Sequence, residues 1–484
     1  MKVNYGIHIS LTSASIAKME NGIPVILKSD SLKDRIPVCV YFNERGTIQI
    51  GDTAYNACKQ KNLQNQKGRE STSENSFVEF TRTLGTDKLY HSTNANKSFK
   101  SEELVAEIIK TLLSFEKNQD INSAVITIPD AFKINQIDAI RQAGKLAGLK
   151  QVEVVQESIA ATLAYGLGSE IKNGYWLVFD FGDGTFNATL LKVEEDITKV
   201  IDIEGDNYLG GKNLDFAIID EIILPYIQEN FVIDSILADY TKKQNLCNAL
   251  RFYAEDVNKK MSFNDIHYII TDLGDIPGED DEGEEFELDI TITQADITKA
   301  LLPVFQKAID ISKSLLERNN LKGSSLDSLA LVGDSTFSPV LRQLLEEQIC
   351  KPNTSIDPMK AVSKGAALYA YTVNVSEEVR EQTRDRTKIQ LEIGYEPYTV
   401  EEEEFITIKI LTEKTDAKIP EKVFAEVTRG DKAWSSGKVE ITNIGEVIEV
   451  PIVDKTKNSF HITLCGKKGN VILCEPNNFV IQKR

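Results

Sequence analysis

The segment FDFGDGTFNATLL, residues 179–191, combines residue types that can bind a phosphate and a metal ion. An apolar run ends in Asp180, a turn follows with Gly182 and Gly184, and Thr185 precedes a second apolar run. Glycine lacks the Cβ that would keep a bulky anion from the main chain, so successive N–H groups can converge on a phosphate. A carboxylate such as Asp180 can hold water on a phosphate-bound cation. Taken alone, such a turn is also compatible with a hairpin that binds nothing.

A second segment of the same form lies near the N-terminus. Residues 4–18, NYGIHISLTSASIAK, again predict a strand, a turn of small polar residues and a strand. When the two segments are superposed, His8 falls opposite Asp180, and residues 10–12 fall opposite residues 182–184. The hairpins start about 172 residues apart, a spacing that indicates a duplicated lobe with one phosphate loop in each copy. Chance similarity between two buried hairpins is the alternative.

Polar residues also stand at two places where a strand passes into a helix. Glu157 follows the apolar run of VEVVQESIAATLAYGLG, and Gly333, Asp334 and Ser335 follow that of LALVGDSTFSPVLRQLLEEQI. A helix N-terminus behind small residues is suited to bind an anion or a nucleotide. By itself, Glu157 is better explained as an acid that interacts favourably with the helix dipole.

The elements that must position these residues alternate between strand and helix. Apolar runs or helical periodicity predict strands at 175–180 and 186–193, a helix at 101–117, and strand-to-helix units at 123–149, 152–168 and 329–349. In the last unit, Ser338 is the expected N-cap and Pro339 the first helical residue. The alternation predicts an α/β fold whose helices cover a largely parallel sheet.

Composition limits the possible partners and the compartment. At 484 residues the chain has room for several domains, and its formal net charge of −19 disfavours nucleic acid and anionic membrane surfaces as partners. Six cysteines without C-x-x-C pairs, at positions 39, 58, 247, 350, 465 and 474, indicate buried thiols in a reducing compartment, with neither a disulfide framework nor a structural zinc site. Without a signal-like start or an apolar run of membrane length, the chain is expected in the cytoplasm.

Together these segments resemble the DnaK-type, seventy-kilodalton heat-shock chaperones. FDFGDGTFNATLL is similar to their second phosphate loop and VVQESIAATLAYGLG to their inter-lobe helix. NYLGGKNLDFAI (207–218) resembles their Leu-Gly-Gly crossover, LALVGDSTFSPVLRQLL their adenosine loop and AVSKGAALYA (361–370) their closing helix. The order and spacing match over about residues 1–373. The resemblance implies a duplicated actin-like, ribonuclease-H-like domain of two lobes, with lobe I at about 1–170 plus 355–373 and lobe II at about 171–354.

The resemblance also implies roles for individual residues in binding ATP or ADP. Asp180, Gly182, Gly184 and Thr185 would surround the terminal phosphates, and Asp180 with Glu157 would order the waters of a Mg²⁺ ion. The remaining nucleotide contacts would come from Ser10, Leu11, Thr12, Gly210, Gly211, Glu255, Lys259, Gly333, Asp334 and Ser335.

Several positions depart from the family pattern. His8 replaces the metal-side acid of the first loop, Thr81 falls at the catalytic lysine, and Asn187 replaces an acid two residues after the second-loop threonine. Asp183 replaces a glycine and adds negative charge. The resemblance therefore implies that nucleotide still binds, that the magnesium site is weakened, and that ATP hydrolysis is slow or absent. Asp183 is a candidate to take over the ordering of water.

The C-terminal part differs in type. Residues 374–387 are charged and predict a solvated linker or a short helix, whereas the family's linker is rich in leucine. Residues 388–484 contain short alternating runs separated by turn signals, which predict a small antiparallel β-sandwich. This domain occupies the place of the family's substrate-binding domain, without a helical lid.

Two classes of function remain open on the sequence. The first is an ATP-regulated chaperone that grips unfolded or extended polypeptide, with a possible co-chaperone. The second is a nucleotide-gated adaptor or binding protein without a refolding cycle, which the altered catalytic positions favour. A metabolite kinase on the same fold is a distant third.

Overall fold

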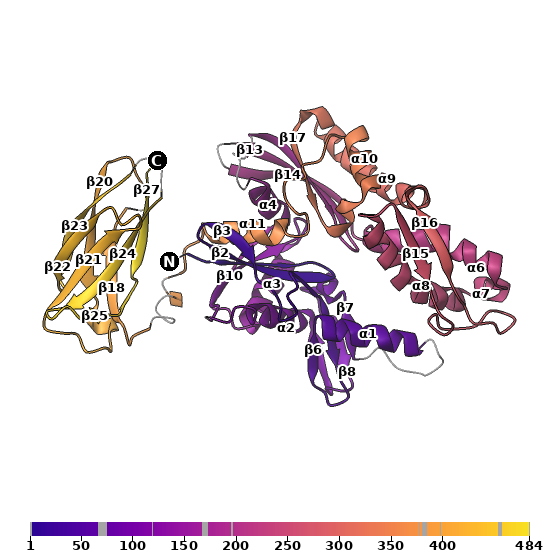
Figure 1. Ribbon diagram of the computed structural model, residues 1–484, viewed down its shortest axis with the longest axis horizontal. Coiled ribbons are helices and arrows are strands. Elements are labelled where there is room, and N and C mark those ends of the chain that lie inside the picture. The colour runs from indigo at the N-terminus through magenta and orange to yellow at the C-terminus, as the bar shows by residue number, and fades with distance from the viewer. Residues whose placement is uncertain are drawn as a thin grey trace. The chain divides into compact units, whose positions relative to one another are not determined.

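The fold is described from a computed structural model, shown as a ribbon in Figure 1. It covers residues 2–65, 75–118, 120–166, 173–194, 197–376, 378–379, 385–396, 398–453 and 457–483. The chain divides into two compact units, Met1–Ser376 and Glu377–Arg484. Part of the predicted linker at 374–387, namely 377 and 380–384, lies outside the described residues.

The first unit begins with a six-stranded sheet in the order β11-β10-β1-β2-β3, to which β4 is added through β2. Its strands are β1 (Tyr5–Ile9), β2 (Ser13–Glu20), β3 (Ile23–Ile26), β4 (Ile36–Pro37), β10 (Ser123–Ile128) and β11 (Gln151–Gln156). Strand β10 pairs in parallel with β1 and β11, whereas β2 is antiparallel to its partners. The sheet is therefore mixed.

Helices cover both faces of this sheet (Figure 1). They are α2 (Ser101–Leu113) and α3 (Ile134–Leu146) on one face, and α11 (Ala361–Ala370) on the other. Ile7 belongs to the core shared with α2 and α3, whereas a Cβ on the neighbouring Gly6 would lie 2.2 Å from the backbone nitrogen of Ala367 in α11. Successive residues of β1 thus face opposite layers, as the pleat of a strand requires.

A second sheet in the same unit has the order β14-β13-β12-β17. Its strands are β12 (Gly174–Phe181), β13 (Phe186–Glu194), β14 (Ile197–Asp206) and β17 (Leu326–Val332). As in the first sheet, an antiparallel hairpin, here β12 and β13, lies beside a parallel strand, here β17. The prediction of a largely parallel sheet is wrong for both, because each hairpin and its neighbours contribute antiparallel pairs.

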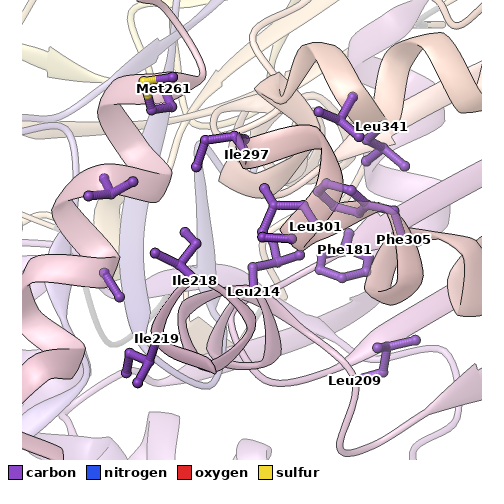
Figure 2. Close-up of a cluster of buried hydrophobic side chains, with 14 of the residues drawn as sticks. Phe181, Leu209, Leu214, Ile218, Ile219, Met261, Ile297, Leu301, Phe305 and Leu341 are labelled. Atoms are coloured by element: carbon purple, nitrogen blue, oxygen red, sulfur yellow. The ribbon is translucent and has the colours of Figure 1, made fainter. Parts of the chain in front are cut away.

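The core of the second sheet is aromatic at the end of the β12–β13 hairpin. Figure 2 shows Phe181 and Phe305 among leucine and isoleucine side chains, and their ring centroids are 5.4 Å apart. The helices that contribute residues to the same apolar core are α5 (Gly211–Ile218), α6 (Leu224–Asn230), α7 (Asp234–Ala238), α8 (Tyr240–Met261), α9 (Gln294–Arg318) and α10 (Pro339–Gln348), of which α9 contacts β13 and β14 directly. Burying this face anchors the turn that leaves β12.

Helix α4 (Glu157–Tyr165) lies between the two sheets and contacts α11. The Tyr165 hydroxyl donates to the Leu331 carbonyl at 2.7 Å, which ties α4 to β17 of the second sheet. A Cβ on Gly365 of α11 would lie 1.6 Å from the Ala160 carbonyl oxygen. The two helices therefore meet backbone to backbone.

Two smaller groups of elements complete the unit. The first contains β5 (Cys39–Phe42), β6 (Ile48–Ile50), β7 (Ser76–Val78), β8 (Leu89–Ser92), β9 (Lys97–Lys100) and α1 (Asp52–Asn65), and the second contains β15 (Ile266–Ile270) and β16 (Asp289–Thr293) with α8. Strand β5 lies between β6 and β7, and α1 packs on it.

The second unit is a β-sandwich with one shared apolar core. One sheet has the order β23-β20-β18-β26 and the other β19-β27-β24-β21-β22, with β25 added through β24. The strands are β18 (Ile389–Gly394), β19 (Tyr398–Thr399), β20 (Glu403–Ile410), β21 (Val423–Arg429), β22 (Ser435–Ile441), β23 (Glu446–Pro451), β24 (Lys457–Gly466), β25 (Val471–Ile472), β26 (Cys474–Glu475) and β27 (Asn478–Lys483). Most pairs are antiparallel, but β18–β26 and β19–β27 are parallel.

Within the residues that the structure describes, no helix combines the length and the apolar character that a membrane crossing needs.

Candidate functional site

A cavity of about 1020 Å³ lies in the first unit and collects most of the predicted residues. The predicted residues that line it are His8, Ser10, Leu11, Thr12, Thr81, Glu157, Asp180, Gly182, Asp183, Thr185, Asn187, Glu255, Lys259, Gly333 and Asp334. The turns of the β1–β2 and β12–β13 hairpins thus face one shared hollow, although they belong to different sheets.

Four predicted residues are not part of this lining: Gly184, Gly210, Gly211 and Ser335. A Cβ on Gly210 would be 2.6 Å from the Gly184 nitrogen, and one on Gly211 would be 3.3 Å from the Ser335 hydroxyl oxygen. Gly210 therefore permits a close backbone approach that any larger residue would block. These residues shape the loops without forming the cavity surface themselves.

The first turn is held by its own serines. The Ser10 N–H donates to the Ser13 carbonyl at 2.8 Å, and the Ser13 N–H donates to the Ser10 hydroxyl oxygen at 3.1 Å. Leu11 reaches the second turn, since a Cβ on Gly184 would lie 2.6 Å from the Leu11 Cδ2 atom. The two turns are therefore in contact across the cavity.

The second turn is fixed through its carbonyl groups. The Gly182 carbonyl accepts from the Gly211 N–H at 3.0 Å, and the Asp183 carbonyl accepts from the Lys212 N–H at 2.8 Å. The turn closes with the Gly182 N–H donating to the Thr185 carbonyl at 3.0 Å. Because its carbonyls bind the crossover into α5, the turn keeps one conformation beside the cavity.

Gly333 fixes the third loop against the second. Its φ is +95°, and a Cβ there would lie 2.2 Å from the Phe181 carbonyl oxygen. Only glycine meets both conditions. The helix behind this loop begins as predicted, with Ser338 as N-cap and Pro339 in the first turn.

Three carboxylates interact beside the first turn. Burial raises the pKa of Glu157 well above its usual range, and repulsion from Asp180 and Asp130 raises it further. Burial, followed by repulsion from Asp130, raises the pKa of Asp180 to about 7. Asp130 accepts hydrogen bonds from the Ser158 and Thr189 hydroxyls. A cation bound beside these carboxyl groups would favour their ionised forms and lower their pKa values again.

His8 lies against this acidic group without neutralising it. Its Nδ1 atom is 3.4 Å from Glu157 Oε1 and 2.9 Å from the Thr127 hydroxyl oxygen. Burial, assisted by the charge of Arg35, lowers the pKa of His8 to about 4. At neutral pH the imidazole is uncharged, so its contact with Glu157 is not an ion pair.

Asp180 and Glu157 suit a magnesium ion that keeps most of its water. Mg²⁺ is commonly bound through one or two carboxylates together with substrate phosphates, rather than by a protein cage. The described residues contain no group of three or more histidine, cysteine or acidic side chains placed to hold a metal ion directly. The elevated pKa values mark these two carboxylates as the groups that such an ion would stabilise.

Asp183 interacts with residues of the first and third loops, Thr12 and Asp334. Burial raises its pKa to about 6, repulsion from Asp334 acts in the same direction, and a hydrogen bond with Thr12 opposes the shift. Further along this wall, Glu255 pairs with Lys259 and accepts from the Tyr55 hydroxyl at 3.4 Å. Helices α1 and α8 thus meet at the cavity.

Sequence reasoning missed several basic residues in the lining, among them Arg82 and Lys212. The Arg82 guanidinium donates to the Gly184 carbonyl at 3.1 Å and to the Asn207 carbonyl at 2.7 Å, and both Arg82 and Lys212 pair with Glu79. Arg82 directly follows Thr81, and Lys212 directly follows the paired glycines. Their proximity to predicted positions was the available signal.

Comparison with known proteins agrees with this arrangement. Residues 4–417 match the family described as Hsp70 protein. The chain is 29% identical over 380 residues to the chaperone protein DnaK of Mycoplasmopsis agalactiae, which covers 76% of this chain and 58% of that relative. It therefore spans little more than half the length of this curated relative. The resemblance inferred from the sequence is confirmed: the chain belongs to the Hsp70 protein family.

Proposed function

We propose that this chain binds ATP or ADP in the cavity and uses that binding to regulate the capture of unfolded polypeptide, as a DnaK-like chaperone. The observation that carries the proposal is that glycine-containing and serine-containing turns from two different sheets line one hollow. Backbone N–H groups in such turns suit phosphates, and the size of the hollow suits a nucleotide.

The proposal includes the finer architecture. Residues 1–373 form an actin-like domain with lobe I at about 1–170 plus 355–373 and lobe II at about 171–354. A charged linker at 374–387 and a β-domain at 388–484 follow. The similar strand order of the two sheets, with a hairpin beside a parallel strand in each, supports the duplication.

Within the cavity, the chain's own groups have distinct tasks. The turn at 182–185 receives the terminal phosphates, with Ser10 and Thr12 facing it from the first turn. Asp180 and Glu157 would hold a water-bound Mg²⁺, which supplies positive charge to the phosphates when bound. Glu255, Lys259 and the loop at 333–335 hold the adenosine end.

Hydrolysis is expected to be weak because the charged groups expected at the phosphate end are replaced. His8 is neutral at physiological pH, and neither Thr81 nor Asn187 carries a charge. Loss of one preorganised group that stabilises transition-state charge costs about 3–4 kcal/mol, on the order of 100- to 1,000-fold in rate. Binding through backbone groups does not depend on these side chains.

The β-domain offers an edge for an extended peptide. Strand β23 ends one sheet, and the exposed side chains of Phe405 on β20 (65% exposed) and Val447 on β23 (62% exposed) lie near it. An extended segment can add to such an edge through main-chain hydrogen bonds, with side-chain contacts to the apolar residues. Unfolded polypeptides are the proposed clients, and a co-chaperone is a further proposed partner.

The alternative is a nucleotide-gated adaptor without a refolding cycle. The uncharged His8 beside Glu157 favours it, because a site that binds nucleotide without turning it over can only switch between bound and free states. We propose the chaperone first because β23 ends its sheet in the strand order of the β-domain.

Nucleotide binding, turnover and client binding test the proposal separately. Isothermal titration should give saturable binding of ATP and ADP, and a phosphate-release assay should give turnover far below that of a DnaK measured in parallel. An Asp183→Gly variant should lose any residual turnover if Asp183 orders the attacking water. A reduced, unfolded model protein should bind without ATP and be released with it; binding of nucleotide without any client would leave the adaptor, and absence of nucleotide binding would refute both.

A further inference from the structure

Two buried thiols meet in the wall of the cavity. Cys39 lies on β5 and Cys58 on α1, and their Sγ atoms are 3.3 Å apart. A disulfide bond is about 2.05 Å long, so the sulfurs would need to approach by only about 1.2 Å to bond. In the part of the chain that the structure describes, no second thiol lies within hydrogen-bond distance of the other four cysteines.

From this contact we propose that Cys39 and Cys58 are a modification site, a dithiol that hydrogen peroxide or a small hydroperoxide converts to an intramolecular disulfide. Both residues line the cavity, although their exposed fractions are only 1% and 8%. A small oxidant can enter a hollow of about 1020 Å³. The cavity therefore provides the route to both sulfurs.

The reaction balances with peroxide as the two-electron oxidant. The thiolate sulfur of one cysteine attacks a peroxide oxygen, the O–O bond breaks, and a sulfenic acid and water form. The sulfur of the second cysteine then attacks the sulfenic sulfur, the S–O bond breaks, and a second water leaves. Two thiols and one hydrogen peroxide give one disulfide and two waters, whereas an organic hydroperoxide gives one alcohol and one water.

The surroundings favour a slow, selective reaction. The hydrogen bond between the two thiols, together with burial, raises the pKa of Cys39 above its usual range. Because the thiolate is the nucleophile, the pair resists brief exposure to oxidant and responds to sustained exposure. The adjacent partner sulfur then captures the sulfenic acid before further oxidation.

The disulfide would fix α1 on β5, and this step rests on the proposed nucleotide-binding function. Helix α1 carries Tyr55, whose hydroxyl donates to Glu255 of α8 across the cavity wall at 3.4 Å. With α1 fixed on β5, the hydrogen bond between Tyr55 and Glu255 would break less often, and the cavity wall would open less often. Bound nucleotide should consequently leave the oxidised protein several-fold more slowly than the reduced protein.

The full chain tests the bond directly. Reduced protein is exposed to hydrogen peroxide, remaining thiols are alkylated under denaturing conditions, and a non-reducing digest is analysed by mass spectrometry. We expect linked peptides containing Cys39 and Cys58 and the loss of two of the six free thiols. Cys350→Ser keeps the pair and should behave as wild type, whereas Cys58→Ser should form no such link.

Because the disulfide-linked peptides are identified in the wild-type protein, the test remains decisive even if Cys58→Ser fails to fold. Oxidation of other cysteines without the Cys39–Cys58 link would overturn the proposal. Dissociation of a fluorescent ADP analogue is measured separately, before and after oxidation. Nucleotide that binds but leaves at equal rates would refute the effect on the cavity, and a mapped disulfide without nucleotide binding would refute the proposed function alone.

Discussion

Replacing Gly182 with alanine separates protein stability from nucleotide binding. Gly182 lines the cavity, and a Cβ there would lie 3.4 Å from the Thr185 carbonyl oxygen and 3.5 Å from its hydroxyl oxygen, both ordinary contacts. Its φ is not among the positive values, so alanine fits the backbone. Gly182→Ala should leave stability unchanged or raise it by up to about 1 kcal/mol, because alanine restricts the unfolded chain.

The same methyl group should weaken nucleotide binding. It occupies space beside the turn where the proposal places a phosphate, and overpacking by a methyl group typically costs about 1–3 kcal/mol. Since about 1.4 kcal/mol corresponds to a factor of ten, Gly182→Ala should weaken ATP affinity by roughly 5- to 150-fold. Ordinary contact in the empty protein thus becomes a clash in the complex.

Gly210→Ala is the matched comparison. Its Cβ would lie 2.6 Å from the Gly184 nitrogen and 2.7 Å from the Gly182 carbonyl oxygen, which are backbone atoms that cannot move aside alone. This variant should lose about 1–3 kcal/mol of stability as well as affinity. Gly211→Ala provides a milder control, because its methyl group would chiefly meet the end of the Asp183 side chain at 2.8 Å.

Thermal unfolding without ligand and isothermal titration with ATP and Mg²⁺ measure the two effects independently. If wild type binds ATP and Gly182→Ala binds it equally well, the phosphates do not contact this turn and the reasoning is wrong. If Gly210→Ala is as stable as wild type, the close approach of the crossover to the turn is wrong.

Three further predictions concern charges around the cavity. The pKa of Asp183 is raised from 3.8 to about 6, so ionisation of this carboxyl group opposes folding as the pH rises between these values. In urea unfolding, Asp183→Asn should match wild type near pH 4 and be more stable by up to about 3 kcal/mol above pH 7. A stability difference that does not depend on pH would contradict this cause. His8→Asp should lower the melting temperature in the absence of metal, because it places a carboxylate beside Glu157. Adding MgCl₂ should raise the melting temperature of this variant by more than it raises that of wild type. Equal increases would argue against a cation at this position. Arg82→Gln removes charge-assisted hydrogen bonds to the Gly184 and Asn207 carbonyls. Thermal unfolding should show a loss of about 1–3 kcal/mol in the free energy of unfolding, and titration should show weaker ATP binding. An unchanged free energy of unfolding would show that these bonds contribute little.

Much of the site could be predicted because its signals are local. The β12–β13 turn with Gly182, and the strand-to-helix unit capped by Ser338, depend on neighbours within a few residues. Buried apolar runs and turn glycines specify such units with little help from distant parts of the chain. The resemblance then supplied the arrangement of these units around one cavity.

What could not be predicted depends on contacts between distant segments. Arg82 reaches the Gly184 carbonyl, 102 residues away, and no periodicity signals such a contact. Cys39 and Cys58 meet because α1 packs on β5, although their spacing matches no thiol motif. The mixed character of the sheets was missed because apolar runs mark buried strands without giving their direction.

The backbone contact between α4 and α11 has a consequence for the width of the cavity. Ala160 and Gly365 interpose no long side chain there, so the separation of the two sheets is set by main-chain thickness. A methyl group added at Gly365 would push α4 and α11 apart and so increase the distance between the two hairpin turns, although it would contact no atom of the cavity lining. Small residues outside the cavity lining thus determine how wide the cavity is.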